Sequence, residues 1–220
     1  AQVDMYGEHA GFEFMTNDLL EWNQLAAIAF VKPLSFMHLD NLLAQSFSVG
    51  VSAGVDLSAP WSLSRVPGSR VTGDGRLAVA ERKAARLFGI DAEVKVVKTE
   101  HVDVKPYVDF SALMEGDGGF TAGVLGRFNF GRRTVHAFRL VAEGRVLGSH
   151  YAPSYFDTFY EIDRYAWFNL DQRAPGAPLA LYVPKHRQVL ETGLGQRTGY
   201  YLEASWGIRG RFCKRFQTVI

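Results

Sequence analysis

Three carboxylates recur within one short stretch of the chain, at Asp157, Glu161 and Asp163. Such a group could supply a general acid and a general base, because carboxylates held close together push one another's pKa values apart. Two arginines, Arg139 and Arg145, precede them at a similar spacing. Opposite charges on neighbouring strands pair and fix the register of the strands. We therefore expect structural ion pairs here and no enzymatic activity.

Ser149, His150 and Ser154 are the other candidates for chemistry, because a serine and a histidine could hydrolyse lipid esters. Adjacent residues on a strand face opposite ways, and no acid that would orient the histidine is evident in the sequence. The six histidines are dispersed without metal-ligand spacing, so we expect no metal and no cofactor. Cys213 is the only cysteine, which excludes an intramolecular disulfide and favours simple packing.

The stretch from Val135 to Trp167 contains both sets of charges and alternates with the period of a β-strand. Mostly apolar residues occupy every second position of 136–146, and the alternation resumes over 155–163 after a break at 148–153. The pattern predicts an antiparallel hairpin in which Arg139 and Arg145 face Asp157, Glu161 and Asp163.

Similar alternation predicts further strands, over 47–57, 104–112, 119–130 and 200–209. Two longer segments rich in Ser, Pro and Gly, near 58–75 and 169–198, are expected to be loops. The chain shows no alternation of helical and strand periods, so a parallel α/β sheet is not expected. We predict one all-β domain spanning residues 1–220, with antiparallel strands in up-and-down order.

The bulk composition excludes several classes of protein. The 220 residues are 47% hydrophobic and carry a net charge of +1, and no apolar run reaches the roughly 20 residues of a membrane-spanning helix. Lys and Arg are scattered along the chain, so no nucleic-acid partner is expected. The chain begins with Ala-Gln, as a secreted protein does after removal of its signal peptide.

Three features predict that the apolar strand faces meet lipid. The segments 119–130 and 134–148 exceed the roughly 9–11 residues with which a tilted strand crosses a bilayer. Aromatic residues gather near the strand ends, and the polar faces mix charged, Tyr, Ser and Gly residues. In these respects the chain resembles the outer-membrane β-barrel proteins of Gram-negative bacteria. The resemblance implies an antiparallel transmembrane barrel of about 10–12 strands located in the outer membrane.

The same resemblance implies roles for individual residues and for partners. Residues assigned to a charge ladder in the lumen are Arg127, Arg139, Glu143, Arg145, Asp157, Glu161, Asp163, Glu203 and Arg209. Residues assigned to the lipid-facing surface are Phe138, Leu140, Val146, Phe156, Tyr160, Ile162, Leu202 and Trp206. The expected partners are the lipid bilayer, other subunits of an envelope assembly, and small polar solutes that pass through a porin-like pore.

Two alternatives remain open at the level of sequence. One is a soluble lipocalin-like barrel that binds an apolar ligand, with Phe138, Leu140, Val146, Tyr160 and Ile162 lining its cavity. The other is an outer-membrane lipid hydrolase that uses Ser149 or Ser154.

Overall fold

A computed structural model gives the structure of the chain, and it is mostly antiparallel β. The structure describes residues 2–17, 22–37, 39–64, 78–131, 135–157, 160–165, 183–209 and 216–219.

One large sheet contains most of the strands. Its first half consists of β1 (Gln2–Tyr6), β2 (Ala10–Thr16), β3 (Gln24–Val31), β4 (Ser48–Asp56) and β7 (Ala85–Glu93). Its second half consists of β9 (Val102–Leu113), β10 (Gly118–Phe130), β11 (Val135–Leu147), β12 (Arg197–Arg209) and β13 (Phe216–Val219). The two-residue strand β8 (Val97–Lys98) pairs only with β9.

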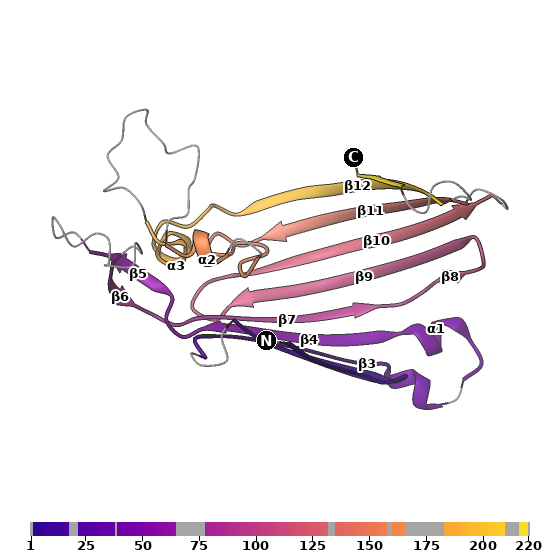
Figure 1. Ribbon diagram of the computed structural model, residues 1–220, viewed down its shortest axis with the longest axis horizontal. Coiled ribbons are helices and arrows are strands. Elements are labelled where there is room, and N and C mark those ends of the chain that lie inside the picture. The colour runs from indigo at the N-terminus through magenta and orange to yellow at the C-terminus, as the bar shows by residue number, and fades with distance from the viewer. Residues whose placement is uncertain are drawn as a thin grey trace.

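The order of strands in this sheet follows the order of the chain, from β1 at one edge to β13 at the other (Figure 1). Every neighbouring pair is antiparallel, as the up-and-down prediction required. The closed barrel that we expected is not formed by these pairings, because no pairing among the described residues joins β1 to β13. The structure therefore establishes an all-antiparallel sheet that the pairings of the described residues do not close into a barrel.

Smaller elements gather at the two ends of the strands (Figure 1). One end carries the separate hairpin of β5 (Pro60–Leu63) and β6 (Val79–Arg82), with α2 (Tyr160–Asp163), α3 (Lys185–Arg187) and a π-helical turn, η4 (Gln188–Thr192). The other end carries a 3-10 turn, η1 (Pro33–Met37), and α1 (Leu42–Ser46). Asn41 begins α1 by accepting a hydrogen bond from the backbone N–H of Ala44 at 2.7 Å.

The longest strands, β10, β11 and β12, form where the sequence alternates most regularly, and they confirm the strands predicted over 119–130, 134–148 and 200–209. β4 and β9 likewise confirm the strands predicted over 47–57 and 104–112. Alternation produces these strands because successive side chains point to opposite faces of a sheet.

The hairpin predicted between 135–147 and 155–163 is wrong. β11 pairs with β12, and the described residues that follow Gly148 form turns and the short helix α2. The error has a physical cause. Phe156 and Tyr160 are four residues apart, a spacing that suits both one face of a strand and one face of a helix. In the structure their rings pack edge to face with centroids 4.7 Å apart.

The predicted loops are only partly loops. Strand β5 lies within the segment 58–75, and residues 65–77 lie outside the described residues. In the segment 169–198, residues up to 182 lie outside the description, and the remainder contains α3, η4 and the start of β12.

Candidate functional site

The two faces of the large sheet differ sharply in chemistry. One face, called here the outer face, exposes large apolar side chains along most of the strands. Examples that are 42% to 68% exposed are Val51, Ile90, Phe110, Phe120, Leu140 and Leu202. The opposite face, called here the inner face, carries Ser and Gly on β4 and charged residues on β7, β9, β10, β11 and β12. The charged side chains that could form a site are therefore on the inner face of the sheet.

Paired charges occupy the middle of the inner face. Arg139 on β11 contacts Glu203 on β12, and Arg145 contacts Glu143 on its own strand. Glu143 also accepts a hydrogen bond from the hydroxyl of Tyr107 on β9. Strand alternation positions these groups, because Glu143 lies between Gly123 of β10 and Tyr201 of β12 in the register. The pairs satisfy charges that the neighbouring strands bring together.

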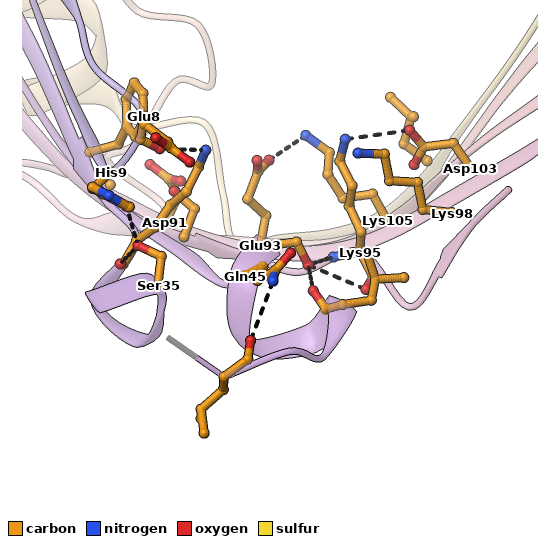
Figure 2. Close-up of a pocket in the computed structure, with 18 of the residues that line it drawn as sticks. Glu8, His9, Ser35, Gln45, Asp91, Glu93, Lys95, Lys98, Asp103 and Lys105 are labelled. Atoms are coloured by element: carbon orange, nitrogen blue, oxygen red, sulfur yellow. Dashed lines mark hydrogen bonds and ion pairs between the residues drawn. The ribbon is translucent and has the colours of Figure 1, made fainter. Parts of the chain in front are cut away.

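A large charged cavity lies at the end of the inner face near η1 and α1, with a volume of about 960 Å³ (Figure 2). Its cationic lining consists of Lys32, Lys95, Lys98, Lys105 and Arg127. Its carboxylate lining consists of Glu8, Asp40, Asp91, Glu93 and Asp103. The lining of this cavity is therefore strongly polar and carries charges of both signs.

Some of these charges pair with one another and others face the cavity alone. Lys105 contacts Glu93, and Lys95 Nζ lies 3.5 Å from Asp103 Oδ2 (Figure 2). No ion pair joins Lys98 or Arg127 to another described residue. These two cations are therefore available to a solute.

A cap covers the opposite end of the inner face. It consists of the β5–β6 hairpin and the described residues of 151–165 and 183–194. Its apolar core buries Ala59, Ala85, Leu113, Tyr151, Ala152, Tyr155, Tyr160 and Val189. Burial of this much apolar surface holds the cap in place.

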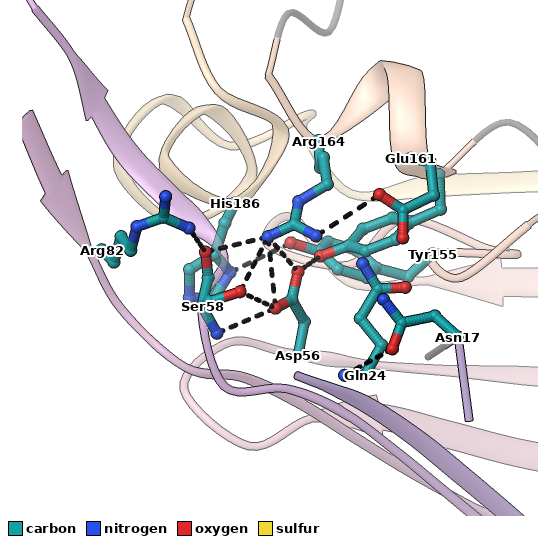
Figure 3. A network of polar contacts seen from close by, with 10 residues as sticks. Asn17, Gln24, Asp56, Ser58, Arg82, Tyr155, Glu161, Arg164 and His186 are labelled. Atoms are coloured by element: carbon teal, nitrogen blue, oxygen red, sulfur yellow. Dashed lines mark hydrogen bonds and ion pairs between the residues drawn. The ribbon is translucent and has the colours of Figure 1, made fainter. Parts of the chain in front are cut away.

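A buried polar network anchors the cap to the end of β4 (Figure 3). Arg164 Nη2 lies 3.1 Å from Asp56 Oδ2, and it donates hydrogen bonds to the backbone oxygen and the hydroxyl of Ser58 at 2.9 and 3.1 Å. The Tyr160 hydroxyl donates to Asp56 Oδ2 at 2.9 Å. The side chains of Arg164 and Asp56 are 5% and 0% exposed. Because buried charges are tolerated only when paired and hydrogen-bonded, this network ties α2 to the sheet.

Burial shifts the titration of several groups in the cap. It raises the pKa values of the Tyr155 and Tyr160 hydroxyls, and it lowers the pKa values of Lys185 and His186. The Lys185 ammonium group lies over the rings of Tyr155 and Tyr160, at 5.3 and 5.6 Å from their centroids. Such cation–π contacts compensate part of the cost of desolvating the ammonium group.

The structure supplies an acid for His150 that the sequence did not reveal. Asp117, in the turn between β9 and β10, accepts a hydrogen bond from the His150 backbone N–H at 2.9 Å. Its Oδ2 also lies 3.2 Å from His150 Nδ1, and these hydrogen bonds lower the pKa of the Asp117 carboxyl. No hydrogen bond joins the hydroxyl of Ser149 or Ser154 to His150 among the described residues. The contact between Asp117 and His150 therefore stabilises two neighbouring turns and does not form part of a catalytic triad with Ser149 or Ser154.

The predicted charge ladder divides into two groups in the structure. Arg127, Arg139, Glu143, Arg145 and Glu203 share the inner face, and the side chain of Arg209 lies outside the described residues. The prediction that Asp157, Glu161 and Asp163 continue this ladder on a strand is wrong. Glu161 and Asp163 lie on α2, where Glu161 Oε2 is 3.5 Å from Arg164 Nη1, and Asp157 lies just before α2.

The predicted lipid-facing residues divide in the same way. Phe138, Leu140, Val146, Leu202 and Trp206 are exposed on the outer face. Tyr160 is only 4% exposed and belongs to the core of the cap, and Phe156 packs against that core. Their assignment to a lipid-facing strand is therefore wrong. The side chain of Ile162 lies outside the described residues.

The amino-acid sequence alone did not indicate the Asp56–Arg164 network or most of the charged cavity. Asp56 ends a strand whose inward positions are otherwise Ser or Gly, and a lone carboxylate at that point was an available signal. The cavity had no comparable signal, because its lining comes from separate stretches of the chain between Glu8 and Arg127.

Among the residues that the structure describes, no group of three or more His, Cys, Asp or Glu side chains could hold a metal ion. No helix in the described part of the chain is long and apolar enough to cross a membrane. Comparisons with protein-family models, with curated proteins and with solved structures found no match to this chain. What the fold and site define is a class: an all-antiparallel sheet with an apolar outer face, a charged inner face and a capped end.

Proposed function

We propose that this chain forms the wall of an outer-membrane β-barrel whose charged lumen admits small polar solutes, in the manner of a porin. The observation that carries the proposal is the contrast between the two faces of the sheet. Leu140 and Leu202 are 47% and 68% exposed on the outer face, whereas Arg139 and Glu203 pair on the inner face. In water such an outer face would promote aggregation, and in a bilayer it is the favourable surface.

The aromatic residues of the outer face support a membrane location. Phe128, Phe138 and Trp206 lie opposite one another on β10, β11 and β12, and Phe138 stacks on Trp206 with centroids 6.1 Å apart. Phe110 and Phe120 lie opposite one another toward the other end of β9 and β10. The two rows are separated by about 27 Å along β10, which a strand tilt of about 40° reduces to about 21 Å along the membrane normal, near the roughly 25 Å apolar band of membrane barrels.

The strand order is compatible with closure of the sheet. The path from β1 to β13 contains ten strands, an even number that includes both edge strands, and each strand is antiparallel to the next. β1 and β13 therefore run antiparallel to one another, as bacterial barrels require of the two strands that meet. Closure would satisfy the edge N–H and C=O groups, which cost several kcal/mol each when left unpaired in hydrocarbon. We propose that β1 and β13 form this seam.

The cap supports a second role beside conduction, as a membrane-embedded subunit of an envelope assembly. A core with several fully buried side chains covers one end of the inner face, including Tyr155 at 1% exposure and Val189 at 0%. Such a cap restricts flow through that end, so solutes would enter the charged cavity from the end that carries α1. A barrel that conducts slowly and mainly serves assembly would have the same structure.

The soluble alternative receives less support from the geometry. An apolar ligand cavity would need Phe138, Leu140 and Val146 on a concave protected face, but all three are exposed opposite the charged face. The hydrolase alternative lacks contact between the candidate serines and His150. We therefore propose a non-catalytic role with neither metal nor cofactor.

Spin labels at paired positions test the membrane proposal. Single cysteines at Leu140 and Leu125, in a Cys213→Ser background, place a label on the outer and inner face of adjacent strands. In lipid vesicles we expect the label at 140 to be relaxed by dissolved oxygen and the label at 125 by a water-soluble nickel chelate. Equal access of the nickel chelate to both positions would contradict the proposal.

A further inference from the structure

A second, smaller cavity lies on the inner face, beneath the edge of the cap. Its volume is about 260 Å³, the size of a site for a single small molecule. The strands β9, β10 and β11 form its floor, and the turn that contains Tyr151 and Ser154 covers it. This cavity is separate from the large charged cavity, which has no lining residue in common with it.

The floor of this cavity is a row of three different polar groups. Asp109 on β9 lies opposite Thr121 on β10, and Thr121 lies opposite Arg145 on β11. The Asp109 carboxylate receives one long hydrogen bond, from the Ser111 hydroxyl at 3.4 Å. The hydroxyl of Thr121 makes no hydrogen bond with another described residue. The row therefore offers free acceptors and a free hydroxyl at adjacent positions.

Two tyrosines that cannot rotate freely contribute aromatic surface to the lining. The Tyr151 hydroxyl is hydrogen-bonded to the Ser111 hydroxyl at 2.5 Å, and the Tyr107 hydroxyl is hydrogen-bonded to Glu143. Because both hydroxyls are held by neighbours, the rings are fixed before any solute arrives. A preorganised site loses less entropy on binding than a flexible one.

The charges of the lining largely cancel. Arg145 donates to Glu143 through Nε at 2.7 Å and also contacts it through Nη2, so this pair carries no net charge. Asp109 is the remaining carboxylate of the lining. A strongly anionic solute would be repelled by Asp109, and the lining contains no free cation to attract it.

The turn above the cavity adopts a costly backbone conformation. Ser154 has a φ of +53°, and it is the one described non-glycine residue with positive φ. Residues held in this region cost of order 1–3 kcal/mol and tend to cluster at binding sites. This strain over the cavity is an observation independent of the polar row on its floor.

Taken together, these features match the chemistry of a neutral sugar. Vicinal hydroxyls of a sugar donate hydrogen bonds to a carboxylate such as that of Asp109 and exchange hydrogen bonds with a hydroxyl such as that of Thr121, and the C–H face of a sugar ring packs on an aromatic side chain. We propose that this cavity binds a neutral polyhydroxylated solute of about one sugar ring. The inference rests on the proposed function, because it supplies the substrate class of the lumen.

Binding is tested by saturation-transfer NMR on the full chain in an amine-oxide detergent, which carries no sugar head group. The probes are glucose, galactose and mannose, with glucuronate and glucosamine as the charged comparisons. We expect saturable transfer to at least one neutral sugar at millimolar concentration, and weaker transfer to glucuronate. Absence of saturable binding by all three neutral sugars, or binding of glucosamine alone, would overturn the proposal.

Two matched variants locate the site. Asp109 lines this cavity, whereas Asp4 on β1 lines neither cavity and only accepts a hydrogen bond from Gln2 at 3.0 Å. We expect Asp109→Ala to weaken sugar binding at least tenfold, Asp109→Asn to restore part of it, and Asp4→Ala to change it less than twofold. Equal losses in Asp109→Ala and Asp4→Ala would overturn the assignment.

Failure of this inference is distinguishable from failure of the proposed function. A protein that enters vesicles with the label pattern described above but binds no neutral sugar refutes only the sugar site. A protein that remains soluble without detergent refutes the membrane barrel, whatever it binds.

Discussion

The guanidinium group of Arg164 lies 3.1 Å from the carboxylate of Asp56, although 108 positions separate the two residues in the chain. The first belongs to the segment after α2 and the second ends β4. Both are buried, and the pair joins the cap to the large sheet. This buried ion pair therefore fixes the position of the cap relative to the sheet.

Removing one partner of this pair should be costly. Arg164→Met leaves Asp56 charged, buried and unpaired, so we expect the free energy of unfolding to fall by about 3–5 kcal/mol. Arg86→Met removes an exposed pair with Glu115, whose side chains are 52% and 35% exposed, and should cost less than about 1 kcal/mol. Urea unfolding of both variants measures the difference. Equal losses would show that the buried pair does not anchor the cap.

His186 should make the cap sensitive to acid. Burial lowers its pKa below the ordinary value of 6.5, so the unfolded cap binds a proton at a higher pH than the folded cap does. Stability is therefore fully present above pH 6.5 and declines as the pH falls through 6.5 toward the lowered pKa. Limited proteolysis of the cap between pH 8 and pH 5.5 measures this decline. His186→Gln should flatten the profile, and an unchanged acid response in that variant would assign the effect elsewhere.

The inner-face arginines should set the ion selectivity of a conducting lumen. Arg139→Gln together with Arg145→Gln leaves Glu203 and Glu143 without their cationic partners. We expect the reversal potential in a salt gradient to shift toward cation selectivity. Unchanged selectivity with lowered stability would mean that these pairs have only a structural role.

The proposed seam predicts a specific cross-link. Cysteines introduced at Asp4 of β1 and Gln217 of β13, in a Cys213→Ser background, should form a disulfide if these two strands pair within about one residue of that register. A matched pair at Asp4 and Ser62 of β5 should not react. Nonreducing gels compare the two variants, with neighbouring positions of β13 scanned in the same way. Failure of every β13 position to react would leave the sheet open.

The strands could be predicted from sequence where one local rule determines the structure. Over 119–130 and 134–148 the side chains alternate strictly, and β10 and β11 form there. The segment 155–163 satisfied the same rule by chance, because aromatic residues four apart also fit a helical turn. The strand that pairs with β11 is β12, which begins about 50 residues after β11 ends, and local periodicity cannot identify so distant a partner.

The candidate site was partly predictable for the same reason. Arg139 and Glu143 are four residues apart on one predicted strand, so the strand period places both on the same face. Arg127 was assigned to that face from the alternation of the preceding strand. The network of Asp56 with Arg164 depends on how the cap packs, and no spacing rule connects residues so far apart. Long-range packing of this kind is set by the whole fold.

The most direct test of the membrane-barrel claim is gel mobility in SDS, comparing unheated with boiled protein extracted in detergent. A closed membrane barrel resists SDS until it is heated, so we expect a faster band for the unheated sample. Identical bands from a protein that is fully soluble without detergent would contradict it.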